Sequence, residues 1–332
     1  MKKKERDEKF AAHMPGVLQY HRLMLGDAVR NRLLAKAIKQ VVNEETSFLD
    51  IGAGSGIWAI LAAKLGAKRV VAVEIEEALI PFIYKHAQEN GVANKIEIIH
   101  GRSDDVKIKG KFDVIVSELF GGDAMGAETI KSFIDLRTRF LAADGVLMPH
   151  RLISFAAPVH LRSDDVPATL DLGTDFLRSV QLNYPINLTA VEKNRAQYLG
   201  EPVPLVDIDF RNIDTPPPLA NLTASWKLED LSKVNAIATF NRHYFTEKIQ
   251  MDSRKSQSWG VGIYPFEPFA VKKGELSLSL TIDAKQGNWT VAVPSNPEIR
   301  PQSYSPVFAF TRVRMSQQMT PHRKFKSPTT KK

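Results

Sequence analysis

Apolar residues in the first half of the chain recur at helical spacing in some stretches and form short unbroken runs in others. Between residues 17 and 42 they return every three or four positions, which predicts one or two amphipathic helices. Further helices are predicted at about 57–65, 76–89 and 128–141, and strands at 47–51, 69–73, 95–100, 112–116 and 145–148. Strands that alternate with helices at this spacing are typical of a parallel, doubly wound α/β sheet.

The pattern changes after about residue 158, where helical periodicity becomes scarce. Short β-rich runs follow between turns, and prolines such as the run at 216–218 interrupt them. Predicted strands lie at 152–156, 225–228, 236–240, 258–264, 276–282 and 289–293. Many short strands separated by turns favour a β-barrel or β-sandwich. We therefore expect a flexible basic N-terminus at 1–16, an α/β domain at 17–150, a β domain at 151–310 and a basic disordered tail at 311–332.

Composition narrows the functional classes. Of the 332 residues, 43% are hydrophobic and 25% are charged, as in soluble globular proteins. No apolar run approaches the roughly 18 to 20 residues of a membrane helix, and the N-terminus lacks the apolar core of a signal peptide. A cytoplasmic protein with no membrane partner is expected. Because the chain has no cysteine, disulfides, thiolate zinc sites and cysteine nucleophiles are excluded.

The net charge of +8 is concentrated at the two ends of the chain. Residues 311–332 carry seven basic residues and no acid, and residues 1–9 carry five basic and three acidic residues. The rest of the chain is nearly neutral, which argues against a built-in nucleic-acid groove. Contact with nucleic acid is expected, if anywhere, through the C-terminal tail, for which a solubilising role is the simpler interpretation.

A glycine-rich turn follows the first predicted strand. Gly52, Gly54 and Gly56 have the spacing G-x-G-x-G, whereas a dinucleotide fingerprint would need glycine in place of Ile57. Asp50, just before the turn, would meet a pyrophosphate with the wrong charge. It suits a ligand that carries an ammonium and a sulfonium, as S-adenosylmethionine does.

Two more strand ends carry side chains suited to a nucleoside. Glu74 ends the second strand, where a carboxylate can accept hydrogen bonds from both ribose hydroxyls. Ser103 and Asp104 follow the next strand, where they can bind a ring nitrogen and an adenine amino group. Each feature alone is weak, but three at successive strand ends point to a nucleoside cofactor.

An acidic loop follows the strand at 112–116. Glu118 lies at its start and Glu128 at its end, and both are expected near the carboxyl ends of the strands, where open α/β sheets bind ligands. Two carboxylates there could hold a planar cation, although solvated loop acids are the common alternative.

With these features in order, residues 17–295 resemble the protein arginine methyltransferases, in which a Rossmann-like domain precedes a β-barrel. Residues 21–30 are similar to the family's H-x-x-M-L-x-D-x-x-R motif. The resemblance implies S-adenosylmethionine as cofactor, an arginine-containing protein or peptide as substrate, and a paired-glutamate loop formed by Glu118 and Glu128. The cofactor residues that it implies are His21, Arg30, Asp50, Gly52, Gly54, Gly56, Glu74, Ser103 and Asp104.

The predicted β domain carries the second part of the resemblance. Ser258-Trp259 and the segment 265–275 resemble the family's T-H-W loop and the P-x-x-V-x-x-G-(E/D) strand after it. The resemblance assigns Met24, Ser258 and Trp259 to the substrate pocket. It also implies a homodimer formed through an arm, here at about 160–195.

The chain departs from the family pattern in three places. Glu118 and Glu128 are ten residues apart where the family usually has nine, so Asp123 is a candidate replacement. Ser258 takes the place of the motif histidine, so we expect Asp27 to lose its usual partner. The aromatic pair before the first helix is also absent, and the number of methyl groups added stays open.

The sequence therefore predicts an N-methyltransferase in which the two glutamates orient and polarise an arginine side chain. Two alternatives remain. One is a methyltransferase for a small amine, a guanidine or nucleic acid, although the Asn/Asp-Pro-Pro-aromatic tetrad of amino-methylating nucleic-acid enzymes is absent after the fourth strand. The other is a methyltransferase fold without activity that serves as a binding protein.

Overall fold

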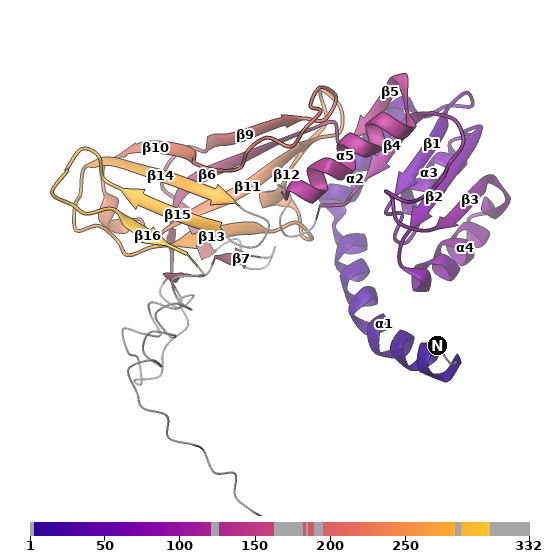
Figure 1. Ribbon diagram of the computed structural model, residues 1–332, viewed down its shortest axis with the longest axis horizontal. Helices are drawn as coiled ribbons and strands as arrows, with labels where there is room; N and C mark the ends of the chain where they lie inside the picture. The colour runs from indigo at the N-terminus through magenta and orange to yellow at the C-terminus, as the bar shows by residue number, and fades with distance from the viewer. Residues whose placement is uncertain are drawn as a thin grey trace, which may run out of the picture.

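The computed structural model describes residues 3–120, 126–162, 182–183, 185–188, 195–282 and 287–305. They form an α/β lobe and a β lobe that lie side by side, with the first helix extending away from both (Figure 1). The α/β lobe contains helices α1 (Lys3–Gly26), α2 (Ala28–Val41), α3 (Ile57–Lys64), α4 (Ile80–Glu89) and α5 (Ala127–Phe140). Its strands are β1 (Ser47–Ile51), β2 (Arg69–Glu74), β3 (Ile96–His100), β4 (Phe112–Ser117) and β5 (Leu141–Met148).

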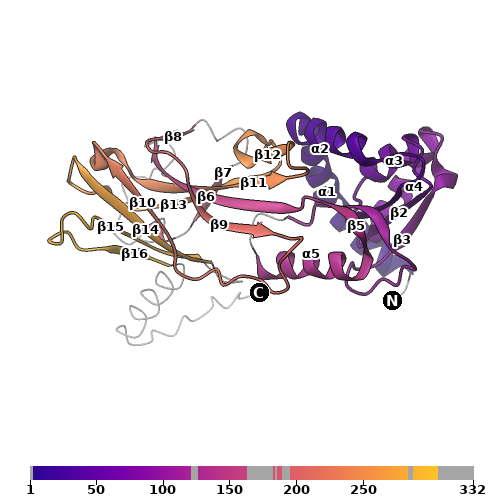
Figure 2. The same ribbon diagram turned by 90° about the horizontal axis from the view of Figure 1, so that it is seen from above.

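The five strands of the α/β lobe form one parallel sheet in the order β3-β2-β1-β4-β5. Helices α2 and α3 lie on one side of it and α5 on the other (Figure 2). Because both faces are covered, β1, β2 and β4 are buried almost throughout, which explains why most of their residues are apolar. The strand order reverses between β1 and β4, the place where sheets of this kind bind ligands.

The β lobe consists of antiparallel strands in two sheets. One has the order β10-β14-β15-β16, and the other has β7-β13-β11-β6-β8 with β12 paired to β11 and β9 paired to β6. The strands are β6 (Arg151–Leu161), β7 (Ile186–Leu188), β8 (Ala196–Tyr198), β9 (Val203–Asp209), β10 (Leu222–Leu228), β11 (Ala236–Tyr244), β12 (Gln250–Asp252), β13 (Val261–Pro265), β14 (Gly274–Ile282), β15 (Gly287–Ala292) and β16 (Gln302–Tyr304). Alternate residues of β10 are buried, as expected for a strand with one face on a core.

The two lobes share a hydrophobic core at their junction. The main core cluster of the α/β lobe also contains Phe210 and Trp259 from the β lobe. Phe133 of α5 stacks on Phe210 with ring centroids 4.5 Å apart, and Phe120 lies between Phe133 and Trp259. The segment after β4 is therefore packed directly against the β lobe.

The predicted fold class, a Rossmann-like sheet followed by a separate antiparallel β domain, is confirmed. Three local expectations differ. Residues 3–16, assigned to a flexible N-terminus, lie in helix α1. The strand predicted from Ser258 begins only at Val261, because residues 256–258 form a turn around Asp27. The helix predicted from Glu76 opens with a 3₁₀ turn, Glu77–Leu79.

Most of the predicted arm at 160–195 and the whole tail at 311–332 lie outside the described residues, so the domain limits stay predictions. Within the described part of the chain, every helix is too short or too polar to span a membrane.

Candidate functional site

The glycine turn after β1 needs residues without a side chain at two of its positions. Gly54 and Gly56 have φ angles of 55° and 76°, in the left-handed region. A Cβ on Gly54 would lie 2.6 Å from the His21 ring, and one on Gly56 would lie 2.7 Å from the Ile83 side chain. The turn is therefore packed closely between α1 and α4, with His21 against its backbone.

Two buried carboxylates flank this turn. Glu74 accepts hydrogen bonds from the backbone N–H of Gly54 at 2.7 Å and of Glu76 at 2.8 Å, which fixes its orientation. Asp50 is 1% exposed and accepts one from the N–H of Ala59 at 3.1 Å. Burial raises the pKa of Asp50 to about 8, and the nearby Glu118 and Glu74 add to the effect although the Ala59 hydrogen bond opposes it. Asp50 is thus mostly protonated at neutral pH until a cation approaches it.

Glu118 emerges from the carboxyl end of β4, and its side chain is 8% exposed. Its Oε2 accepts hydrogen bonds from Nη2 of Arg30 at 3.1 Å and from Nε1 of Trp58 at 2.7 Å. Its Oε1 lies 3.0 Å from Nε of Arg30. Burial raises the pKa of Glu118 above its usual value, although Arg30 and Trp58 lower it. A buried carboxylate in this position already coordinates a guanidinium group.

Arg30 connects the predicted cofactor and substrate residues. It is 2% exposed, and Nη1 lies 2.9 Å from Sδ of Met24 while the rest of the guanidinium faces Glu118. Met24, predicted for the substrate pocket, and Glu118, predicted to be catalytic, thus both contact Arg30, which is predicted to bind the cofactor. Because α1 ends and α2 begins here, residues six apart along the chain meet at one point.

Asp27 loses the motif histidine, as expected, but other groups take over the hydrogen bonds to its carboxylate. Its Oδ2 accepts hydrogen bonds from the hydroxyls of Ser256 and Ser258 and from the backbone N–H groups of Gln257 and Ser258. Its Oδ1 caps α2 through the N–H of Arg30 at 3.1 Å. Two serines and the backbone of their turn therefore take the place of the family's motif histidine. Burial raises the pKa of Asp27, but these hydrogen bonds together hold it below its usual value.

Replacing Ser256 by Ala should lower the free energy of unfolding by about 1–3 kcal/mol, since it leaves a buried carboxylate short of a donor. The hydroxyl also accepts from the N–H of Trp259 at 2.8 Å, so the turn that holds Trp259 should loosen. Urea denaturation measures this. The matched control is Ser232→Ala, which removes a hydroxyl bound to the exposed Asp230 and should change little. Equal effects of the two variants would contradict the assignment.

Trp259 lies in an aromatic cluster at the lobe junction. Its ring is 4.1 Å from the His243 ring and 5.9 Å from the Phe120 ring. His243 is fully buried, and this burial lowers its pKa to about 3, so it is neutral at physiological pH. Trp259 is thus packed by uncharged rings from both lobes, beside the turn that binds Asp27.

Several other predicted site residues make no contact with Arg30 or Glu118 among the interactions of the described residues. Glu128 is 82% exposed on α5 and pairs with Lys131 at 2.7 Å. Residues 121–125, including Asp123, lie outside the described part. Asp104 is more than half exposed and pairs with Arg102 at 2.9 Å. The backbone carbonyl of Ser103 accepts a hydrogen bond from the Arg139 side chain. This contact fixes the backbone of Ser103 and does not involve its hydroxyl.

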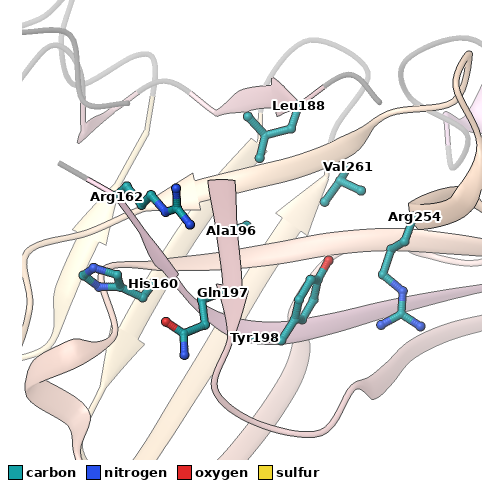
Figure 3. A pocket seen from close by; sticks show the side chains of 8 residues that line it. All are labelled: His160, Arg162, Leu188, Ala196, Gln197, Tyr198, Arg254 and Val261. Atoms are coloured by element: carbon teal, nitrogen blue, oxygen red, sulfur yellow. The ribbon is translucent and has the colours of Figure 1, made fainter. Parts of the chain in front are cut away.

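A separate cavity of about 490 Å³ lies in the β lobe (Figure 3). Its lining residues are His160, Arg162, Leu188, Ala196, Gln197, Tyr198, Arg254 and Val261, and none of them is a predicted site residue. Arg254 is held there by Asp252 at 2.7 Å. Among the described residues, no three His, Asp or Glu side chains are grouped to hold a metal.

Sequence reasoning missed three residues of the site, namely Trp58, Ser256 and His243. Trp58 follows the glycine turn by two positions, and a large indole at the start of a buried helix was a visible signal. Ser256 precedes the quoted Ser258-Trp259 pair by two residues, but an isolated serine carries no signal of its own. His243 lies in a β-rich run, where no neighbouring motif marks it as a site residue.

Comparison with protein families and curated proteins finds methyltransferases. Residues 31–153 match the family model of the ribosomal protein L11 methyltransferase (PrmA). The chain is 29% identical over 225 residues to the probable protein arginine N-methyltransferase 6 of Arabidopsis thaliana. The aligned region covers 67% of this chain and 50% of that protein. It is 37% identical over 133 residues to the ribosomal protein arginine N-methyltransferase rmt3 of Schizosaccharomyces pombe, covering 39% of the chain and 24% of that protein. The match thus spans about half or less of these relatives.

Solved structures with the same fold are also arginine methyltransferases. A chain of the Trypanosoma brucei PRMT1 enzyme-prozyme heterotetrameric complex with AdoHcy aligns with a TM-score of 0.73 at 17% identity, covering 86% of this chain and 97% of the other. Arabidopsis thaliana protein arginine methyltransferase 10 aligns with a TM-score of 0.69 at 21% identity, covering 87% and 99%. The chain is thus similar in sequence to protein arginine N-methyltransferases and shares the fold of these solved structures.

Proposed function

We propose that the protein transfers a methyl group from S-adenosylmethionine to the guanidinium group of an arginine in a protein substrate. One observation carries this proposal. The buried Glu118 carboxylate lies at the point where the strand order reverses, next to the glycine turn, and it already binds a guanidinium from within the chain. A carboxylate in this setting suits a substrate arginine.

The residues around the glycine turn fit the cofactor. When bound, S-adenosylmethionine supplies an electrophilic methyl group on a sulfonium. Arg30 would hold its carboxylate, Asp50 would face its ammonium, and Glu74 would accept from the ribose. Glu74 retains this capacity because each carboxylate oxygen has two lone pairs and only one is taken by a backbone N–H. Ser103 and Asp104 would bind the adenine.

In the proposed mechanism Glu118 works as an anion. An arginine side chain stays protonated in protein, so its nitrogens are poor nucleophiles until charge is drawn towards one of them. The Glu118 carboxylate would orient the guanidinium plane and concentrate its positive charge away from the reacting nitrogen. Arg30 and Trp58 favour the ionised carboxylate against the cost of burial. Glu128 enters the proposal as a second, weaker acceptor because its side chain is solvent-exposed.

Binding of S-adenosylmethionine at pH 7 should release protons from Asp50. Its pKa of about 8 means that Asp50 is about nine-tenths protonated at this pH, and a neighbouring cation favours the ionised form. Affinity should therefore rise with pH between about 6 and 8. Titration calorimetry in two buffers of different ionisation enthalpy measures the release. Wild type should release about half a proton or more beyond the Asp50→Asn variant, and no difference between them would contradict this assignment.

The Asp50→Asn variant has a second readout. A carboxyl group whose folded pKa is raised destabilises the protein as pH rises from its unfolded pKa of about 4 to its folded pKa of about 8. Asn carries no charge and can still accept from Ala59. At pH 8 the variant should therefore be more stable than wild type while it binds the cofactor less tightly.

The substrate class is tested with labelled S-adenosylmethionine in cell lysate. The proposal predicts label in the protein fraction, on arginine after acid hydrolysis. Label in RNA or in small molecules would favour a methyltransferase with another substrate. Binding of S-adenosylhomocysteine with no transfer to any fraction would favour a binding protein without activity, and absence of binding would remove every enzymatic function considered.

A homodimer is also proposed. Within the described residues, the exposed large apolar side chains are all in the α/β lobe, on or near α1 and α4, and comprise Leu18, Tyr20, Leu23, Leu25, Ile75, Phe82 and Tyr84. A second copy would cover this surface, as exposed apolar groups of this extent favour association. Sedimentation should give a dimer at micromolar concentration, and Phe82→Ser with Tyr84→Ser should weaken it. A wild-type monomer would contradict the proposal. The cytoplasmic location and the role of the basic tail stay predictions.

A further inference from the structure

Trp58 donates a hydrogen bond to Glu118 that is not needed to form the glycine turn or the acidic loop. It is the second residue of α3, is 5% exposed, and points its indole N–H at Oε2 of Glu118 at 2.7 Å. Packing alone would be satisfied by any large apolar side chain at this position. A donor aimed at a buried carboxylate acts on that carboxylate's orientation and charge.

The two oxygens of Glu118 are unequal because of this contact. Oε2 accepts from both Trp58 and Nη2 of Arg30. Oε1 is buried, and although Nε of Arg30 is 3.0 Å away, the alignment is too poor for a hydrogen bond. Within the described part of the chain, Oε1 therefore accepts no hydrogen bond. A buried carboxylate oxygen in this state favours an incoming N–H donor.

We propose that Trp58 is a positioning residue that keeps Oε2 occupied and leaves Oε1 as the acceptor for an N–H of the substrate guanidinium. This inference rests on the proposed function. Glu118 then binds its substrate through one oxygen, in a plane fixed by the indole and Arg30. The second N–H of the substrate remains free of Glu118.

The same contact sets the pH range in which Glu118 is ionised. The charged and titratable groups that face Glu118 are Arg30 and Asp27 at the start of α2, Tyr20 of α1 and Asp50 of β1. Burial raises the pKa of Glu118, Arg30 and Trp58 lower it, and Asp27 raises it. Without the indole donor the pKa rises further, so a reaction that needs the anion begins at higher pH.

The test compares Trp58→Phe with Trp226→Phe. Trp226 of β10 is similarly buried, at 6% exposed, and its indole donates at 2.8 Å to the carbonyl of Glu201, far from the site in sequence and in the other lobe. Both variants lose one buried indole donor, but only Trp58 touches the proposed acceptor. The pH dependence of kcat/KM for an arginine peptide and the Kd of S-adenosylhomocysteine are measured for each.

For Trp58→Phe we expect the acid limb of the pH profile to move up by about one pH unit and kcat/KM at pH 7 to fall about tenfold. The Kd of S-adenosylhomocysteine should change less than about threefold, and Trp226→Phe should keep the wild-type profile. If Trp58→Phe does not fold, a benzothienylalanine at position 58 keeps the ring shape and removes the N–H.

A Trp58→Phe or benzothienylalanine profile that matches wild type would overturn the inference, as would an equal shift in Trp226→Phe. Failure of the proposed function is distinguishable, since wild-type protein would then transfer no methyl group to the peptide at any pH.

Discussion

Glu118→Gln should lower methyl transfer to an arginine peptide by about a thousandfold. The amide keeps the shape of the side chain but loses the charge that polarises the substrate guanidinium. Glu118 also neutralises Arg30, so the variant should be less stable than wild type without ligand and should recover stability when a ligand carboxylate pairs with Arg30. Single-turnover rates and the Kd of S-adenosylhomocysteine separate these effects.

The control for this variant is Glu97→Gln, which changes an exposed glutamate on β3. It should leave both the rate and the Kd unchanged. Transfer by Glu118→Gln within about tenfold of wild type would remove Glu118 from the mechanism, and a lost S-adenosylhomocysteine affinity would show that the residue acts through the cofactor site instead.

Arg30→Met should lower the free energy of unfolding by about 3–5 kcal/mol. It leaves the buried Glu118 carboxylate with the Trp58 donor and no countercharge. Affinity for S-adenosylhomocysteine should fall as well, because the proposed partner of its carboxylate is gone. Chemical denaturation and calorimetry measure the two losses.

Arg151→Met provides the comparison for Arg30→Met, since it breaks the half-exposed pair between Arg151 and Asp207. That pair should contribute at most about 1 kcal/mol. A double variant, Arg30→Met with Glu118→Leu, should regain much of the lost stability because no buried charge remains. Equal losses for Arg30→Met and Arg151→Met, or a double variant no more stable than Arg30→Met, would contradict the buried pair.

The parallel sheet and the edge at which it binds ligands could be predicted from the sequence because short local patterns determine both. Mostly apolar segments mark β1, β2 and β4, and the glycines of 52–56 mark a turn that no other residue fits. Glu118 could be placed at the edge of the sheet because a side chain that follows a buried strand must emerge there. These inferences need no knowledge of distant contacts.

The contacts that complete the site could not be predicted because they join distant segments. Asp27 and Ser256 are separated by 229 positions, and Trp58 and Glu118 by 60. Neither spacing has a period or a motif. Ser258 stands where the family motif has a histidine, and hydroxyl and backbone donors from its turn satisfy the Asp27 carboxylate.

The charge of Asp50 was also invisible in the sequence. An aspartate before a glycine turn predicts an anion that attracts a cation. Complete burial instead raises the pKa of Asp50 to about 8, which favours the protonated form at neutral pH. Glu128 contrasts with Asp50 in its burial, which the sequence also does not show. It lies in the first turn of α5, exposed to solvent and paired with Lys131.

The proposed mechanism requires Glu118 to bind a substrate arginine beside the methyl donor. The most direct measurement is mass spectrometry of a peptide with one arginine, and of the same peptide with lysine in its place, after incubation with the protein and S-adenosylmethionine. We expect a methyl group on a guanidinium nitrogen of the arginine peptide, none on the lysine peptide, and loss of the product with Glu118→Gln. Methylation of both peptides, or an arginine product that persists in Glu118→Gln, would contradict it.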